Sequence, residues 1–183
     1  GISPEGPPSV REKSGADAPS DRAALEQKAA MLEAMLDRSP EFKGLKDQIE
    51  IRMTDDGLRI ELIEKTDSLF FDSGSAVLKA ETIRLLQAIG RELATLRNHI
   101  VVEGHCDSRR YSTSGNYTNW ELSVDRANAA RRAMEPELPD GQIDGVRGYA
   151  ATRLRVPEDP LDPRNRRVSI VVRNRAAVTK TAS

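Results

Sequence analysis

The sequence predicts an α/β fold, an α+β sandwich in which helices pack on one face of a mixed β-sheet. Three observations predict it. Two alternating apolar runs flank a turn in residues 48–65, a helical apolar pattern over residues 78–97 leads directly into a short apolar strand, and two further strand-like runs follow a second helix. Helices that alternate with strands after an opening hairpin are typical of this architecture.

The composition allows one domain of ordinary size plus a tail. The chain has 183 residues, 38% of them hydrophobic, and domains run to roughly 100 to 150 residues. Its 28 basic and 29 acidic residues leave a formal net charge of −1, so no strong overall field attracts nucleic acid or anionic lipid. We therefore expect no nucleic-acid partner. We also expect a soluble chain, since no run approaches the roughly 20 apolar residues that span a bilayer and the first residues lack the apolar stretch of a signal peptide.

Residues 21–38 are predicted to form a helix, with Asp21 as its N-cap. The apolar positions that recur at helical spacing are Leu25, Ala29, Leu32 and Leu36. This stripe is too narrow to found a core, so it suits docking on a domain or pairing with another helix.

The domain boundaries follow from composition. The first residues are rich in Pro, Gly, Ser and charge, which cannot bury enough apolar surface to offset ordering. We expect a flexible linker over 1–20, a linker helix region over 21–45, a folded domain over 46–175 and a flexible tail over 176–183.

The folded domain is expected to open with a β-hairpin over residues 48–65. Asp55, Asp56 and Gly57 provide the turn chemistry between two alternating runs. The apolar positions that answer one another across it are Ile49, Ile51 and Met53 on one strand and Leu58, Ile60 and Leu62 on the other.

A helix is expected over 78–97, and the strand at 99–104 follows it directly. The inward positions of this helix are Ile83, Leu86, Ile89, Leu93 and Leu96. Two more strands are expected over 143–150 and 166–174, separated by the Pro-rich loop 155–165.

A second helix is expected from about Asn119 to Met134. Thr118 and Glu121 have the spacing of a capping box at its start. The residues expected to face inward are Trp120, Val124, Ala127, Ala130 and Met134.

His105, Cys106 and Asp107 are three chemistry-bearing residues in a row, which raises the possibility of a metal-dependent hydrolase. Adjacent strand residues point to opposite faces, so we expect His105 and Asp107 to share a face while Cys106 points away. The only other histidine, His99, lies roughly 20 Å off along an extended strand, and zinc needs three or four converging ligands. A structural thiol at Cys106 is the simpler interpretation.

Asp107 and Arg126 are the stronger candidates for a binding site. Asp107 follows a strand end, and Arg126 shares a helix face with Leu122 at i, i+4. A carboxylate and a guanidinium at one pocket suit a zwitterionic ligand, whereas the alternative is a plain ion pair between the two side chains.

Several motifs resemble the OmpA-like peptidoglycan-binding domains. The family pattern Gly-His-Thr-Asp, then Asn-x-x-Leu-Ser-x-x-Arg-Ala, then Asn-Arg-Arg-Val is matched by "GHCD" at 104–107, "NWELSVDRA" at 119–127 and "NRRV" at 165–168. The segments "DGLRIELIEK", "FFDSGSAVL" and "RSPEFKGLKDQIEI" add a similarity to the MotB family of flagellar stator subunits. The similarity covers about residues 35–175, and Cys106 departs from the usual threonine.

The resemblance implies a role for each matching residue. Asp107 and Arg126 grip the ammonium and carboxylate of diaminopimelate in the peptidoglycan stem peptide, Asn119 adds an amide hydrogen bond, and Leu122 provides an apolar wall. Asp72 is a further site residue or the cap of a turn. Arg166 and Arg167 match a family motif that is partly structural and ties the last strand to its neighbours. The loop after Asp107 also puts Arg109 and Arg110 next to the pocket, either as contacts for glycan-linked carboxylates or as solvated surface arginines.

The implied function is non-enzymatic: peptidoglycan binding that anchors a flagellar stator to the wall and couples anchoring to stator activation in motility and chemotaxis. No cofactor or metal is expected. A MotB-like protein is a homodimer that works with MotA, and this chain corresponds to the periplasmic part of a single-pass cell inner membrane protein. The alternative is another OmpA-like cell-wall anchor, such as an outer-membrane protein or lipoprotein domain.

Overall fold

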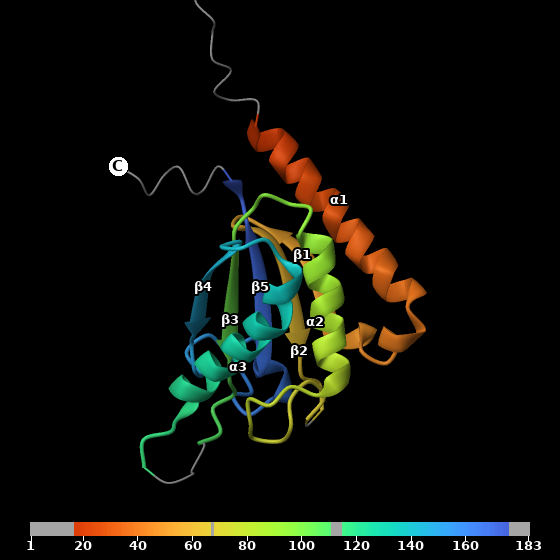
Figure 1. Ribbon diagram of the computed structural model, residues 1–183. Helices are drawn as coiled ribbons and strands as arrows, with labels where there is room; N and C mark the ends of the chain where they lie inside the picture. Colours follow the sequence, from red (N-terminus) through yellow and green to blue (C-terminus); the bar gives the residue numbers. More distant parts are fainter. Residues whose placement is uncertain (1–16, 67, 111–114, 176–183) are drawn as a thin grey trace, which may run out of the picture.

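The computed structural model describes residues 17–66, 68–110 and 115–175 (Figure 1). The expected tail over 176–183 and most of the expected linker over 1–20 lie outside these residues. Within them, the α-helices and strands in chain order are α1 (Asp17–Arg38), β1 (Ile49–Thr54), β2 (Gly57–Ile63), α2 (Ala80–Leu93), β3 (Ile100–His105), α3 (Asn119–Met134), β4 (Ile143–Gly148) and β5 (Arg167–Arg173).

The strands form one mixed sheet in the order β1-β2-β5-β3-β4. Neighbours are antiparallel except β3 and β4, which are parallel. The hairpin has the predicted register, with Ile51 opposite Ile60. Gly57 has a φ of +138°, and a Cβ there would lie 2.1 Å from the carbonyl oxygen of Val172, so only glycine fits at this turn. The predicted α/β fold is confirmed.

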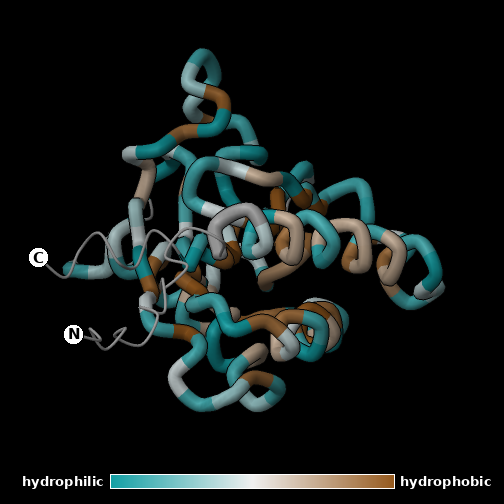
Figure 2. Tube along the Cα trace, turned by 90° about the horizontal axis from the view of Figure 1, so that it is seen from above, coloured by the Kyte–Doolittle hydropathy of each residue, from teal (hydrophilic) through white to brown (hydrophobic). Residues whose placement is uncertain are grey.

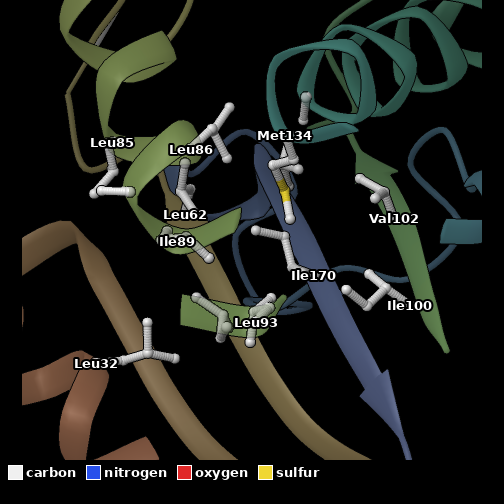
Figure 3. Close-up of a cluster of buried hydrophobic side chains, with 14 of the residues drawn as sticks. Leu32, Leu62, Leu85, Leu86, Ile89, Leu93, Ile100, Val102, Met134 and Ile170 are labelled. Carbon is white, nitrogen blue, oxygen red and sulfur yellow. The ribbon is translucent and has the colours of Figure 1, made fainter. Parts of the chain in front are cut away.

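All three helices cover the same face of the sheet, and one hydrophobic core lies between the two layers (Figure 3). Leu62, Ile100, Val102 and Ile170 reach it from the strands, and α2 and α3 supply Leu85, Leu86, Ile89, Leu93 and Met134. Leu32 of α1 enters the same cluster, together with Leu25 and Leu36. The narrow stripe of α1 is therefore docked on the domain.

Helix α1 begins one turn earlier than expected, at Asp17, so Asp21 lies inside it and the N-cap prediction is wrong. Instead, the Asp21 carboxylate accepts hydrogen bonds from Asn98 Nδ2 and from the backbone N–H of Arg175, both at 2.9 Å. Asn98 precedes β3 and Arg175 follows β5. The side chain thus attaches α1 to one end of the sheet, which no local pattern could indicate.

Helix α3 has the predicted bounds and the predicted capping box between Thr118 and Glu121. Its inward face is the expected one at Ala127, Ala130 and Met134, which are buried, but the prediction is wrong for Trp120 and Val124, which are 53% and 42% exposed. The helix turns Ser123 toward the sheet, where a Cβ on Gly104 would lie 1.9 Å from the Ser123 carbonyl oxygen. This close approach rotates Leu122 and Arg126 inward and Trp120 outward.

Seen from above in Figure 2, the hydrophobic stretches lie mostly toward the inside, whereas most peripheral turns are hydrophilic. Among the described residues, no helix has both the length and the apolar character needed to cross a membrane. The segment after β4 covers the face of the sheet opposite the helices, where Arg155 Nη1 pairs with Glu61 at 3.2 Å and the Tyr149 ring stacks on His105.

Candidate functional site

A cleft of about 200 Å³ lies where β2 and β3 end and α3 begins, at the lower end of the sheet in Figure 1. The site residues expected from the sequence all line it, and they are Asp72, Asp107, Asn119, Leu122 and Arg126. The lining also includes Arg109, which the sequence analysis placed next to the pocket, and the structure adds Glu64, Phe71, Cys106 and Arg166. Segments as far apart in sequence as Glu64 and Arg166 therefore converge on one cleft.

Asp107 is held on both carboxylate oxygens. The backbone N–H of Arg109 donates to Oδ1 at 2.9 Å, and Arg166 Nη1 donates to Oδ2 at 2.7 Å. The Asp107 side chain is 5% exposed and that of Arg166 is 13% exposed, so this ion pair is largely withdrawn from water and stronger than a surface pair. Arg166, which precedes β5, therefore lines the cleft and does more than connect the last strand to its neighbours.

Arg126 points into the cleft from the second turn of α3. Its Nε donates to the carbonyl oxygen of Ser75 at 2.9 Å. Its guanidinium lies over the Phe71 ring, 5.0 Å from the centroid, a stabilising cation–π arrangement. Leu122, one turn earlier and buried, forms an apolar wall beside it. A fixed cation therefore stands next to apolar surface.

Asn119 joins the helix start to the loop that carries Asp107. Its Nδ2 donates to the carbonyl oxygens of Asp107 at 3.3 Å and of Arg109 at 2.9 Å. This amide thus sets the position of the loop relative to α3. Asp72 is exposed, and its backbone closes a turn in which Ser75 N–H donates to the Asp72 carbonyl oxygen at 3.0 Å.

Glu64 and Phe71 are lining residues that the sequence reasoning missed. The buried Glu64 carboxylate accepts the backbone N–H groups of Leu69 and Phe70 at 2.9 and 3.1 Å, so it shapes the loop that presents Phe71. The sequence held one signal for this loop, the aromatic pair in "FFDSGS", but no local pattern shows which ring faces a site.

The expectation that His105 and Asp107 share a face while Cys106 points away is wrong. Strand β3 ends at His105, so alternation does not continue to Asp107, and Cys106 and Asp107 both line the cleft. His105 lies on the opposite face, its Nε2 3.5 Å from Glu103 Oε1. Within the described ranges no group of three or more His, Cys, Asp and Glu side chains is arranged to hold a metal ion.

Cys106 is a buried thiol. Its sulfur donates to the Asn119 carbonyl oxygen at 3.6 Å. Burial raises the pKa of the Cys106 thiol to about 11, so the thiolate that a nucleophile requires is scarce at neutral pH. The thiol is a packing and hydrogen-bonding group of the cleft.

A family model described as the OmpA family matches residues 70–167, more than half of the 183 residues. The chain belongs to the OmpA family. The matched span contains Asp72, Asp107, Asn119, Arg126 and Arg166, and thus most of the cleft. The family is non-enzymatic.

The relatives are MotB-like. Motility protein B of Escherichia coli K12 is 34% identical over 86% of this chain, and Motility protein B of Bacillus subtilis is 30% identical over 85%. The chain spans 52% and 60% of their lengths, respectively. A MotB-like protein from Desulfovibrio vulgaris has the same fold, with a TM-score of 0.70 at 18% identity over 86% of this chain and 99% of that one. The periplasmic domain of Helicobacter pylori MotB gives a TM-score of 0.60 at 21% identity over 72% and 93%.

Proposed function

We propose that this chain binds peptidoglycan through the cleft and thereby anchors a MotB-like flagellar stator to the cell wall. The observation that carries the proposal is the combination of the buried Asp107 carboxylate, the Arg126 guanidinium and the apolar wall of Leu122 in one cleft. This combination matches the side chain of diaminopimelate, which carries an ammonium and a carboxylate at the end of an alkyl chain. Charge-assisted hydrogen bonds to both groups give such a ligand its orientation.

Each cleft residue has a part in the proposed complex. The Asp107 carboxylate accepts hydrogen bonds from the ligand ammonium, while Arg166 holds that Asp107 carboxylate in position in the cleft. Arg126 donates to the ligand carboxylate, and its contact with Phe71 fixes the guanidinium in advance. Asn119 offers its side-chain oxygen to a backbone N–H of the ligand, since its Nδ2 already donates to two carbonyl oxygens, and Asp72 at the rim is a further contact for the ligand ammonium.

The stator assignment is supported by how far the similarity extends. The match to Motility protein B of Escherichia coli covers 86% of the chain, well beyond the family span at 70–167. Another kind of OmpA-like anchor would share the cleft, so the sequence similarity to Motility protein B in the region before residue 70 is what favours a stator subunit over it. The proposal includes a periplasmic location, a membrane span outside this sequence, assembly with MotA and a homodimer.

The positions of α1 and the cleft suit an anchor under tension. Asp21 near the start of α1 is bonded to Asn98 and Arg175, at the end of the sheet where β3 begins and β5 ends. The cleft is at the opposite end, where β3 finishes (Figure 1). A tether that enters through α1 would therefore pull along the domain, away from the wall-binding end.

We also propose that residues 21–45 act as a linker region distinct from the wall-binding domain at 46–175. Docked α1 restrains the stator, and released α1 lets the domain reach the wall, which couples anchoring to activation. Release would break the ion pair between Lys28 Nζ and Glu92 Oε2, which are 3.4 Å apart. The Lys28 side chain is 7% exposed in the docked state.

Pelleting with purified peptidoglycan tests the binding proposal. Asp107→Ala and Arg126→Ala should each weaken binding by roughly tenfold to a hundredfold, since a lost hydrogen bond to a charged group costs about 1.5 to 3 kcal/mol. The matched controls are Asp140→Ala and Arg132→Ala, both at exposed positions outside the cleft. Circular dichroism establishes that each variant is folded. Folded cleft variants that pellet like the wild type would contradict the proposed roles.

A further inference from the structure

A second groove adjoins the cleft on the outer side of α3. It lies between the start of α3 and the end of β4, and its lining includes Arg110, Thr118, Asn119, Trp120, Ala150 and Thr152. Trp120 is 53% exposed, and it is the only tryptophan of the chain. A large aromatic ring left open beside a mainly apolar groove marks an interaction surface, because such exposure is unfavourable in water.

The floor and wall of this groove are rigidly built. Ala150 has a φ of +49°, a left-handed conformation that needs support from its surroundings in a residue other than glycine. The backbone N–H of Ala150 donates to Ser123 Oγ at 3.0 Å, and the Ala150 carbonyl oxygen accepts from the Cys106 N–H at 2.8 Å. On the other side, the backbone N–H of Trp120 donates to Thr118 Oγ1 in the capping box. The ring is therefore presented from an ordered helix start.

We infer that this groove binds a sugar ring of the peptidoglycan glycan strand, with Trp120 as its stacking platform; the inference rests on the proposed wall-binding function. A pyranose has an apolar face of C–H groups, which packs on the face of an indole, and a rim of hydroxyl and acetamido groups. The groove has the matching pair of surfaces. Trp120 and Ala150 supply the apolar side, and Thr152, whose hydroxyl donates to the Tyr149 carbonyl oxygen at 2.6 Å, retains an oxygen that accepts from a sugar hydroxyl.

The groove adjoins the cleft, and this favours a sugar of peptidoglycan as the ligand of the groove. Asn119 lines both depressions, and Trp120 is the next residue on the same helical turn. In peptidoglycan the stem peptide is covalently attached to a sugar, so one ligand can place its amino-acid side chain in the cleft and its sugar in the groove. Two linked contacts of this kind add affinity without a second loss of translational freedom.

The test compares two soluble ligands: a stem peptide that contains diaminopimelate but no sugar, and the disaccharide muropeptide with the same stem. The wild type should bind the muropeptide more tightly by roughly threefold to tenfold, the range expected of one aromatic stacking contact. Trp120→Ala should bind the free stem peptide like the wild type and lose the preference for the muropeptide. Met31→Ala, at another exposed apolar residue, on α1, is the matched control and should retain it.

Tryptophan emission provides a direct readout because Trp120 is the sole source of it. The muropeptide should shift or quench this emission in the wild type, whereas the stem peptide alone should change it much less. If the wild type binds both ligands equally, or if Trp120→Ala keeps the preference, the sugar site is wrong while the cleft stands. If the wild type binds neither ligand, the wall-binding function fails and the sugar site fails with it.

Discussion

At the scale of single residues, Cys106 has the most unexpected position. It lines the cleft beside Asp107, and its thiol reaches across to the carbonyl oxygen of Asn119 at the start of α3. A thiol is a weak donor, whereas a hydroxyl is a strong one. Cys106 therefore forms a weaker hydrogen bond to the Asn119 carbonyl oxygen than a threonine at the same position would.

Cys106→Thr should keep the fold and bind peptidoglycan at least as well as the wild type, because the hydroxyl can donate to the same carbonyl oxygen in a side chain of similar size. Pelleting with purified peptidoglycan measures the binding, and thermal unfolding measures stability. Cys106→Val, which has the shape of threonine without its hydroxyl donor, is the matched control for Cys106→Thr. A folded Cys106→Thr variant that no longer pellets would show that the sulfur itself is needed in the cleft.

At the scale of elements, α1 contributes to the core while retaining a narrow apolar stripe. Leu25 and Leu32 are 0% and 1% exposed in the same cluster as the residues of α2 and the sheet. An isolated helix of this length is marginal in water, so its persistence depends on docking. That dependence is what qualifies α1 as the movable element of the proposed coupling.

The double change Leu25→Glu with Leu32→Glu should release α1, since two buried leucines are each replaced by a charge that the core cannot solvate. Limited proteolysis should then cut before residue 45, while the domain after Ile49 stays folded. In the full-length protein the same change should alter ion leakage or motility.

Met31→Glu is the control for this experiment, because Met31 is on the same helix but 44% exposed. Proteolysis of the double variant at the rate of this control, together with normal motility, would reduce α1 to a passive spacer.

At the scale of the whole molecule, the sheet separates a helix-covered core from an opposite face rich in charge. On that face Glu103 accepts from Arg59 Nη1 at 2.8 Å, beside His105. Burial alone raises the pKa of Glu103, but His105 and Arg59 more than offset it and hold that pKa at about 2. Burial lowers the pKa of His105; Glu103 and Glu61 act against this, and Arg167 adds to it.

These shifts predict that acid destabilises the fold. As pH falls through about 6.5 the unfolded state binds a proton at His105 before the folded state does, because the pKa of His105 is lowered in the folded state, and from about pH 4.5 toward 2 the same holds for Glu103. In both cases the unfolded state binds more protons, so the free energy of unfolding falls as pH falls. Urea midpoints between pH 7 and pH 3 measure the slope.

In His105→Gln, the slope between pH 6.5 and 5 should become shallower, because the buried titrating ring is gone. His99→Gln, at the exposed histidine, is the matched control for loss of a histidine. An unchanged slope in His105→Gln would rule out the buried ring as a source of the acid sensitivity.

Local patterns in the sequence determined the elements and their order. The turn at Gly57, the capping box of Thr118 and Glu121, and the apolar spacing of α2 each depend on neighbours a few residues away, so they can be read without a fold. The motifs around Asp107, Asn119 and Arg126 likewise predicted that these residues lie together, because their order and spacing resemble a known family pattern, and all three line one cleft.

Only the tertiary structure decided which way side chains at the element ends face. The close crossing of Ser123 over Gly104 turned Trp120 outward and Arg126 inward. The end of β3 at His105 brought Cys106 into the cleft, and the approach of the segment before β5 gave Asp107 its partner Arg166. These outcomes depend on how closely segments distant in sequence pack, a property of the assembled layers that no local periodicity contains.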